Sequence, residues 1–297
     1  MNTTGSSSVL QRPIRDRVLD ALGFAAAPPL DLGGLHALYA AWCAHVPFDN
    51  VRKMIALRTP GAPLPGTTAD DFFDAWLHDG AGGTCWPSSH ALWALLDSLG
   101  FDARRVVSSM RDTGAGSHGT VKVRVEGRDW LVDSSMLTNA PAPCGEEVHI
   151  GGDPVWPIEI EPVGSTHLIW FDGFPSLDPL ICRVLQDPAD PGWYATAYEG
   201  SRARSPFNQR LYVRRNFPGE VRLLVGPTRL SKTAAGVDAR TLSPDALCRT
   251  LHSEMGVSER LVASWVKSGS LESSLEPAPE IVPPPPASVR PSQRAAV

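Results

Sequence analysis

The side chain best suited to covalent chemistry is Cys85, within Gly82-Gly83-Thr84-Cys85-Trp86-Pro87. Residues Ser88 to Leu99 predict a helix, with leucines at helical spacing and a glycine directly after it. Pro87 suits the first turn of such a helix, where a missing N–H costs nothing. We therefore expect Cys85 at or near a helix N-terminus, where unpaired N–H groups and the helix dipole favour a thiolate. A buried and inert thiol is the alternative interpretation.

A histidine and an aspartate follow on a predicted β-hairpin. Residues 121–125 and 129–133 alternate apolar and polar side chains around Glu126-Gly127, which we take as the two central turn residues. In that register Val121 faces Val132, Val123 faces Trp130, and Arg124 faces Asp129. His118 and Asp133 then become diagonal neighbours on one face. A carboxylate beside a histidine orients the ring and stabilises its charged form. A surface histidine with a solvated aspartate is the alternative.

Cys85, His118 and Asp133 together are the residue types of a nucleophilic acyl transfer. The histidine takes the thiol proton, the aspartate holds the imidazole, and the thiolate attacks a carbonyl or thioester carbon. A hydrolase of the cysteine-peptidase type uses the same three groups, and exclusion of water from the acyl-enzyme separates the two activities.

Composition excludes several other functions. Hydrophobic residues make up 42% of the 297 residues, and the net charge of −5 favours neither nucleic acid nor a membrane surface as partner. Five dispersed cysteines and no apolar leader or membrane span predict a cytoplasmic location. A metal site made of Cys85, His90, Cys144 and His149 lacks the close paired spacings of structural zinc, so no metal is expected.

The chain resembles the arylamine N-acetyltransferase family, best over residues 14–135. The resemblance lies in the order and spacing of several short motifs. These are His45-Val46-Pro47-Phe48-Asp49-Asn50, Gly82-Gly83-Thr84-Cys85, His90, Gly100-Phe101, Ser117-His118, Gly127 and Trp130-Leu131-Val132-Asp133, with weaker similarity at Ser205-Pro206-Phe207 and over 211–230.

The resemblance implies an α+β fold with an N-terminal helical bundle, a β-barrel-like middle domain, a small α/β C-terminal domain and a cysteine-peptidase-like Cys/His/Asp core. We expect a flexible N-terminus over 1–14, the helical domain over 15–101, the barrel-like domain over 102–205, the α/β domain over 206–270 and a Pro-rich disordered tail over 271–297.

The same resemblance implies Cys85, His118 and Asp133 as the catalytic triad of a ping-pong N-acyltransferase. Acetyl-CoA or another acyl thioester is then the co-substrate, no cofactor is permanently bound, and the acceptor is a small-molecule amine. Trp86 and Phe48 are expected in the substrate site, with core packing as the alternative for Trp86.

Three positions and one segment depart from the family pattern. Ala81 stands where the family commonly has Arg, Ser89 where it has Asn, and Asp49 where it has Glu. Ser134-Ser135-Met136-Leu137 replaces a Gly-Phe-Gly segment beside the donor pocket. Two other functions therefore stay open. One is an amide synthase that releases an acyl chain from a carrier protein in natural-product biosynthesis, and the other is an inactive binding module.

Overall fold

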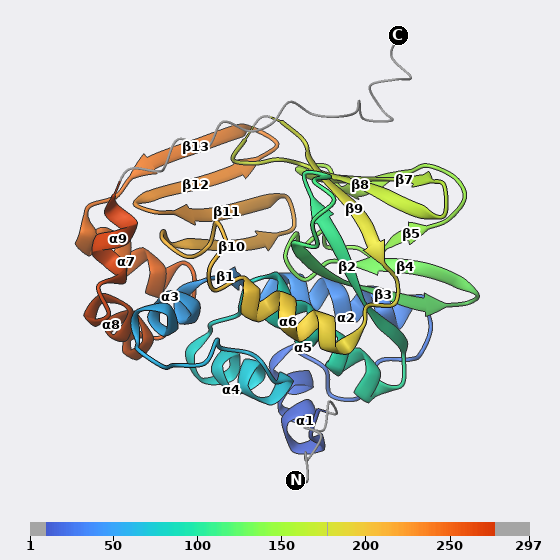
Figure 1. Cartoon of the computed structure of the whole chain (residues 1–297), viewed down its shortest axis with the longest axis horizontal. Coiled ribbons are helices and arrows are strands. Elements are labelled where there is room, and N and C mark those ends of the chain that lie inside the picture. Colours follow the sequence, from blue (N-terminus) through green and yellow to red (C-terminus); the bar gives the residue numbers. More distant parts are fainter. Residues whose placement is uncertain (1–9, 177, 277–297) are drawn as a thin grey trace.

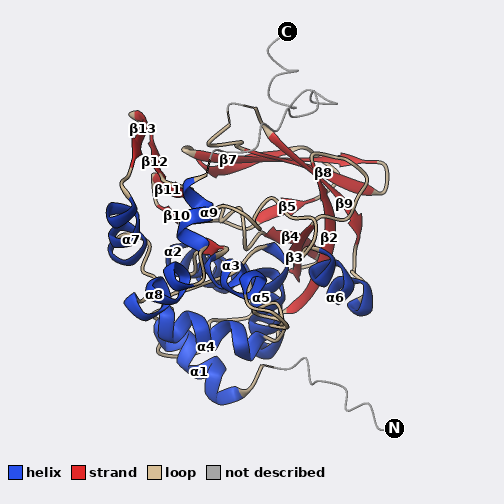
Figure 2. Cartoon of the chain, turned by 60° about the vertical axis from the view of Figure 1, so that its left-hand side comes forward, coloured by secondary structure: helices blue, strands red, loops and turns tan. Residues whose placement is uncertain are grey.

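The computed structural model describes residues 10–176 and 178–276 (Figure 1). Helices gather at one end of the molecule and sheets at the other (Figure 2). The first part of the chain is helical and contains α1 (Arg12–Ala21), α2 (Leu32–His45), α3 (Val51–Arg58), α4 (Ala69–Asp79) and α5 (Cys85–Leu99). Apolar residues at helical spacing predict helices over 16–22, 32–44 and 88–99, and a fourth that Thr68 or Asp70 begins and that runs through Leu77. The pattern misses α3, whose eight residues show no clear apolar stripe and include a buried lysine.

Local sequence explains where these helices begin and end. The Thr68 hydroxyl accepts a hydrogen bond from the Asp71 N–H and caps α4, as expected. Gly100 ends α5 in the left-handed region, at φ 98°. The predicted flexible N-terminus needs one correction, since α1 already begins at Arg12 and has a proline in its first turn. Residues 1–9 lie outside the described residues.

The middle of the chain forms an antiparallel sheet in the order β5-β4-β3-β2-β9-β8-β7-β6. β5 also contacts β6 and β7, so the sheet nearly closes into a barrel. Its strands are β2 (Asp102–Met110), β3 (His118–Val125), β4 (Arg128–Val132), β5 (Ala142–Cys144), β6 (His149–Asp153), β7 (Trp156–Val163), β8 (Thr166–Phe171) and β9 (Leu180–Gln186). The predicted α+β fold class with a barrel-like sheet is confirmed.

The register of the β3–β4 hairpin is the predicted one. Val121 pairs with Val132, and Val123 pairs with Trp130. Glu126 and Gly127 form the turn with φ values of 52° and 75°, the left-handed pair that a two-residue hairpin turn requires. The hairpin packs against α5, and this contact brings its strand ends to the cysteine.

A second antiparallel sheet has the order β1-β10-β11-β12-β13. Its strands are β1 (Phe48–Asp49), β10 (Tyr212–Phe217), β11 (Glu220–Val225), β12 (Thr228–Thr233) and β13 (Gly236–Thr241). The sequence predicts a turn at Gly219 between alternating stretches, and helices over 242–255 and from Ser258 through Trp265. All three are confirmed, the helices as α7 (Pro244–Ser253) and α8 (Glu259–Lys267). Because β1 belongs to the helical part of the sequence, this sheet links the two ends of the chain.

Besides α3, two further helices were not predicted. Pro191–Gly200 is α6, within residues 140–200, whose Pro and Gly content predicts short strands and long loops; Asp190 caps it and two buried tyrosines lie on one face. Ser270–Leu275 is α9, so the predicted tail begins too early. α9 is fixed by the Ser274 hydroxyl, which accepts a hydrogen bond from the Leu211 N–H at 2.9 Å. The remainder of the Pro-rich tail, residues 277–297, lies outside the described residues.

Candidate active site

Cys85 is the first residue of α5, with Thr84 as the N-cap, so the expected position at a helix N-terminus is confirmed. Its side chain is buried but keeps 7% of its surface exposed. Sγ lies 3.9 Å from the Ser117 carbonyl oxygen, next to the start of β3. Cys85 thus lies in the first turn of α5, where the backbone N–H groups of a helix have no carbonyl partner within it.

The two glycines before Thr84 allow close backbone packing. A side chain at Gly82 would meet the Pro47 carbonyl oxygen at 1.9 Å, and one at Gly83 would meet Pro87 at 2.9 Å. The Gly82 N–H donates to Asp49 Oδ2 at 2.6 Å. These contacts fix the loop that precedes Cys85 against β1.

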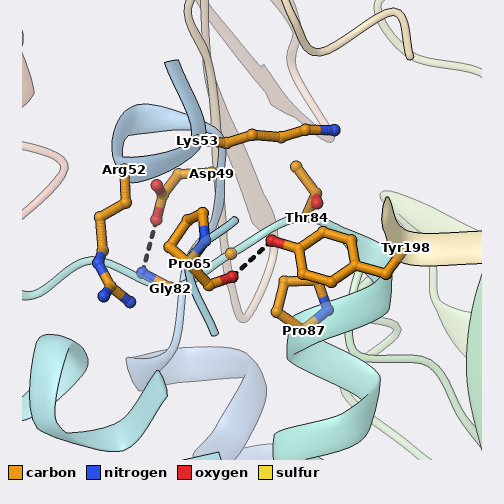
Figure 3. Close-up of a pocket in the computed structure, with 9 residues that line it drawn as sticks. Asp49, Arg52, Lys53, Pro65, Gly82, Thr84, Pro87 and Tyr198 are labelled. Atoms are coloured by element: carbon orange, nitrogen blue, oxygen red, sulfur yellow. Dashed lines mark hydrogen bonds between the residues drawn. The ribbon is translucent and has the colours of Figure 1, made fainter. Parts of the chain in front are cut away.

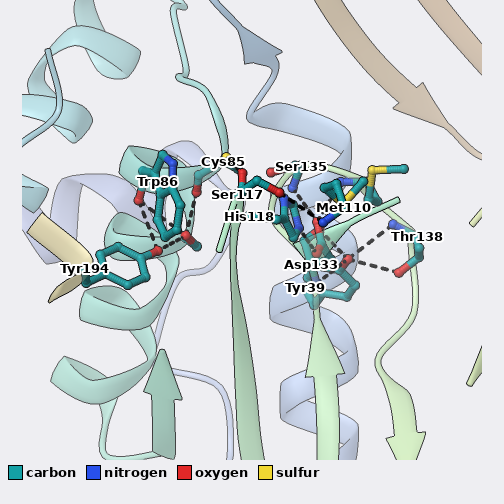
Figure 4. Close-up of polar contacts among 12 residues, drawn as sticks. Tyr39, Cys85, Trp86, Met110, Ser117, His118, Asp133, Ser135, Thr138 and Tyr194 are labelled. Atoms are coloured by element: carbon teal, nitrogen blue, oxygen red, sulfur yellow. Dashed lines mark hydrogen bonds and ion pairs between the residues drawn. The ribbon is translucent and has the colours of Figure 1, made fainter. Parts of the chain in front are cut away.

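His118 and Asp133 form a buried pair near Cys85 (Figure 4). His118 Nε2 lies 2.7 Å from Asp133 Oδ2, and both side chains are buried. This contact engages Nε2, so Nδ1 is the ring nitrogen that does not contact Asp133. The diagonal relation between the two residues that the hairpin register predicted is therefore present.

Asp133 is held by more than the histidine. Its Oδ1 accepts hydrogen bonds from the Ser135 and Met136 N–H groups at 2.9 and 2.8 Å. The Tyr39 hydroxyl donates to the Asp133 carbonyl at 2.7 Å and accepts from the Asp133 N–H at 3.0 Å. Both carboxylate oxygens and both backbone polar groups are thus oriented, which fixes the direction of Oδ2 toward the ring.

The two pKa shifts in the pair have opposite signs. Burial alone lowers the pKa of His118, but the charge and hydrogen bond of Asp133, with a smaller contribution from Cys85, raise it well above its ordinary value. Burial alone raises the pKa of Asp133, but His118 and two backbone N–H groups bring it below its ordinary value. The pair therefore favours an imidazolium beside a carboxylate, the arrangement that stabilises a neighbouring thiolate.

The two predicted substrate-site residues lie in aromatic clusters. Trp86 packs edge-on against Tyr194 and Trp193 of α6. Phe48 packs edge-on against Phe207 and Tyr212. Both are buried, so their described contacts are packing contacts.

The positions that depart from the family pattern have defined surroundings. Ser89 lies against the Tyr194 hydroxyl, and its own hydroxyl donates to the Cys85 carbonyl. Ser134 and Ser135 are buried, and their hydroxyls have no hydrogen-bond partner among the described residues. Asn216 on β10 donates from Nδ2 to the Leu137 carbonyl at 2.7 Å and ties this segment to the second sheet.

Sequence reasoning missed two residues near the site. The sequence places Tyr39 only on the apolar face of the predicted 32–44 helix, and nothing in it links Tyr39 to Asp133, 94 residues away. Lys53 lies in the unpredicted helix α3, where a buried lysine had no local signal.

Within the described part of the chain, no group of three or more His, Cys, Asp or Glu side chains is placed to hold a metal ion. His90 instead lies 3.1 Å from an Arg105 nitrogen. Among the helices of residues 10–176 and 178–276, none is long and apolar enough to cross a membrane.

Comparison with known proteins confirms the resemblance found in the sequence. A family described as N-acetyltransferase matches residues 31–143. A curated arylamine N-acetyltransferase from Mycolicibacterium smegmatis is 32% identical over 124 residues, which cover 39% of this chain and 43% of that protein. The sequence match thus spans less than half the length of this relative. The family match over residues 31–143 includes Cys85, His118 and Asp133.

Solved structures extend the similarity in fold to most of the chain. An N-arylamine acetyltransferase from Mycobacterium smegmatis has a TM-score of 0.76 at 19% identity, covering 88% of this chain and 98% of that one. The Mycobacterium marinum arylamine N-acetyltransferase in complex with CoA has a TM-score of 0.74 at 18% identity, covering 87% and 97%. The arrangement of helices and sheets is therefore shared well beyond the matched sequence.

Proposed function

We propose that this chain, which resembles arylamine N-acetyltransferases in sequence over its first half and in fold over most of its length, is a cysteine-dependent N-acyltransferase. It moves an acyl group from a thioester, acetyl-CoA or another acyl-CoA, to a small-molecule amine. One observation carries the proposal: at the start of α5, Cys85 Sγ lies 3.9 Å from the carbonyl oxygen of Ser117, the residue before His118, and His118 Nε2 is held 2.7 Å from Asp133.

In the first half-reaction His118 accepts the thiol proton, and the Cys85 thiolate attacks the thioester carbonyl carbon. The tetrahedral intermediate collapses, the carbon–sulfur bond to the donor breaks, and the departing thiolate takes the proton from the imidazolium. An acyl-enzyme and a free donor thiol result. Asp133 keeps the imidazole oriented and stabilises its charge throughout.

In the second half-reaction an amine attacks the acyl carbon on Cys85. The amine loses a proton to His118, the bond to sulfur breaks, and the thiolate is regenerated with the amide as product. Donor thiol leaves before the amine reacts, so the kinetics are ping-pong. The chemistry needs no permanently bound cofactor. That the Mycobacterium marinum relative was solved with CoA supports a CoA thioester as donor.

The test is intact-protein mass after brief mixing with a panel of acyl-CoA and acyl-carrier-protein thioesters. The wild-type chain should gain the mass of one acyl group, and Cys85→Ala should gain none. Cys248→Ala is the matched control, because Cys248 is a half-buried thiol with a raised pKa away from the site, and it should gain mass normally.

Each other result points elsewhere. A gain from carrier thioesters alone makes the chain an amide synthase that releases carrier-bound acyl chains. A gain that persists in Cys85→Ala refutes the nucleophile. No gain from any donor refutes the acyltransferase and favours an inactive binding module.

A further inference from the structure

Asn216 connects the second sheet to the turn that follows Asp133, and the mechanism above does not use it. The residue lies in β10 and is only 1% exposed. Its Nδ2 donates to the Leu137 carbonyl at 2.7 Å and to the Met136 carbonyl at 3.3 Å. A side-chain amide has two N–H donors, so Asn216 directs its whole donor capacity to this one turn.

The same turn holds the Asp133 carboxylate. Asp133 Oδ1 accepts from the Ser135 and Met136 N–H groups at 2.9 and 2.8 Å. The Asp133 carbonyl accepts from the Leu137 N–H at 3.1 Å. The peptide group between Met136 and Leu137 is therefore held at both ends, since its carbonyl accepts from Asn216. A shift of this peptide group would move the neighbouring N–H groups that hold Oδ1, and so would turn the carboxylate.

The turn has a conformation that needs support from outside. Leu137 has a φ of 52°, in the left-handed region that a leucine adopts only where its surroundings hold it there. The Ser134 and Ser135 hydroxyls are buried and make no hydrogen bond among the described residues, so they do not supply this support. Asn216 supplies it, because its two hydrogen bonds fix the peptide carbonyls on both sides of the Leu137 Cα.

The Asn216 side chain is itself held in one orientation. The Arg214 Nε–H donates to Asn216 Oδ1 at 2.9 Å, which directs the Nδ2 end of the amide toward the turn. The Arg214 guanidinium lies over the Trp156 ring of β7, 3.5 Å from the ring centroid, and Arg214 is buried. The two side chains thus connect the second sheet, the barrel-like sheet and the turn after Asp133.

The second sheet also holds the loop before Cys85. Its strand β1 pairs with β10. Asp49 of β1 accepts the Gly82 N–H at 2.6 Å, as Figure 3 shows. Neighbouring strands of one sheet therefore contact both the segment that precedes the thiol and the segment that follows the carboxylate.

We propose that Asn216 is a positioning residue of the site: its amide fixes the turn after Asp133 and thereby the direction in which that carboxylate meets His118. This inference rests on the proposed function for its meaning, because the orientation of His118 matters only if the imidazole serves Cys85. Asn216 lies outside residues 31–143, which the N-acetyltransferase family matches, so the second half of the chain supports a site whose chemistry lies in the first.

The pKa of His118 reports the orientation of Asp133. Burial lowers the pKa of His118, and Asp133 overcomes this effect through its charge and its hydrogen bond, with smaller contributions from Cys85 and Cys182. A carboxylate that turns away loses the hydrogen bond and part of the charge interaction, while the effect of burial remains. A looser turn should therefore lower the pKa of His118.

The experiment follows the ring Cε1–H signal of His118 by NMR from about pH 5 to 11, in protein labelled with ¹³C-histidine. The signal is identified by its absence from His118→Gln. Asn216→Ala removes both hydrogen bonds to the turn, and we expect the pKa of His118 to fall by about one unit, the low end of the shift that one nearby opposite charge produces. Circular dichroism checks folding, and Asn216→Leu takes the place of Asn216→Ala if the latter does not fold.

Asn208→Ala is the matched control. Asn208 is also buried, and its Nδ2 donates to the carbonyls of two consecutive residues of another segment, Ser201 at 3.1 Å and Arg202 at 2.9 Å. This variant loses as many hydrogen bonds as Asn216→Ala, but its His118 titration should match wild type. An Asn216→Ala titration that superimposes on wild type refutes the proposal. An equal fall of the pKa in both variants also refutes it, since general loosening of the fold then explains the change.

The titration requires no acyl donor, so the two proposals fail separately. A chain whose Cys85 is acylated by a thioester, yet whose His118 titration does not respond to Asn216→Ala, retains the proposed function and loses this inference. A chain whose titration responds, but which no thioester acylates, retains the positioning role of Asn216 and loses the acyltransferase.

Discussion

Replacing Asp133 with asparagine exchanges one carboxylate oxygen for an NH₂ group, and so tests whether the carboxylate controls His118. Asp133 Oδ1 accepts from two backbone N–H groups, at 2.9 Å from Ser135 and 2.8 Å from Met136. An asparagine keeps its oxygen at that position, because its NH₂ group cannot accept those bonds. The NH₂ group must then take the place of Oδ2 and donate to His118 Nε2. This fixes the proton on Nδ1, the nitrogen that should accept the Cys85 proton, so the histidine is held in the wrong tautomer.

The size of the expected fall in acylation rate follows from the burial of His118 and Asp133. Asp133 is only 1% exposed, and His118 is nearly as enclosed, so an imidazolium formed in the variant has neither water nor a carboxylate beside it. Breaking a buried charged pair by removing one partner costs about 3–5 kcal/mol. Since each 1.36 kcal/mol is a factor of ten in rate, acylation of Cys85 should slow on the order of 10²- to 10⁴-fold.

The pH dependence gives a second readout. Asp133 raises the pKa of His118, so wild-type His118 stays protonated to higher pH. In Asp133→Asn that pKa falls, and the alkaline limb of the rate profile should move to lower pH. The assay is single-turnover acylation by the donor identified from the mass experiment, measured across the pH range.

Asp129→Asn is the control for this prediction. Asp129 lies on β4, the strand that ends just before Asp133, but it binds Arg104, at 3.1 and 2.6 Å, rather than a histidine. The acylation rate of Asp129→Asn should stay within a few-fold of wild type. A fall of less than tenfold in Asp133→Asn, together with an unmoved alkaline limb, would show that the carboxylate does not control the imidazole.

Three further outcomes are expected. Tyr39→Phe leaves the buried Asp133 N–H without its acceptor and should lower the free energy of unfolding by about 1–3 kcal/mol in a urea titration, whereas an unchanged midpoint would mean that the hydroxyl adds nothing. Gly82→Ala drives a methyl group into the Pro47 carbonyl, 1.9 Å away, and should destabilise by about 1–3 kcal/mol or more in the same titration; wild-type stability would contradict the close packing.

The third outcome concerns the pH range over which His118–Asp133 stabilises the fold. Asp133 has a lowered pKa, so its contribution is lost as the pH falls through that pKa; His118 has a raised pKa, so its contribution is lost as the pH rises through it. The Tm difference between wild type and Asp133→Asn should be largest between about pH 4 and 6.5, the unfolded values of the two groups. A difference that does not vary with pH would argue against an ionised pair.

Local patterns were sufficient for the elements that carry the proposed chemistry. The β3–β4 register could be predicted because the Glu126-Gly127 turn and the alternating side chains constrain each other over a few residues. The start of α5 was predictable to within three residues for a similar reason, since a glycine pair, a proline in the first turn and a terminal glycine are short-range signals. Two members of the proposed triad came from one hairpin, so their proximity was also a local property.

The sequence did not predict α6 and α9, because their local helix signals are weak and their surroundings have a composition typical of loops. Asp190-Pro191 is a helix start, but the Pro- and Gly-rich surroundings of α6 favoured loops. Ser270–Leu275 is a short, serine-rich helix. It is held by the Ser274 hydroxyl, which accepts from the Leu211 N–H just before β10 and donates to the Ser270 carbonyl.

By itself, the sequence determined the elements, the hairpin register and the three residue types suited to acyl transfer. Only the tertiary structure decided that Cys85 meets His118, that Tyr39 holds the Asp133 backbone, and that Lys53 is enclosed beside the cap of α5. The physical reason is the separation in sequence between the residues that contact each other. Turns, caps and strand pairing depend on neighbours a few residues apart, whereas Tyr39 and Asp133 are separated by 94 residues and Lys53 and Ser201 by 148. Such contacts exist only once α2, α3 and α6 are packed together around α5.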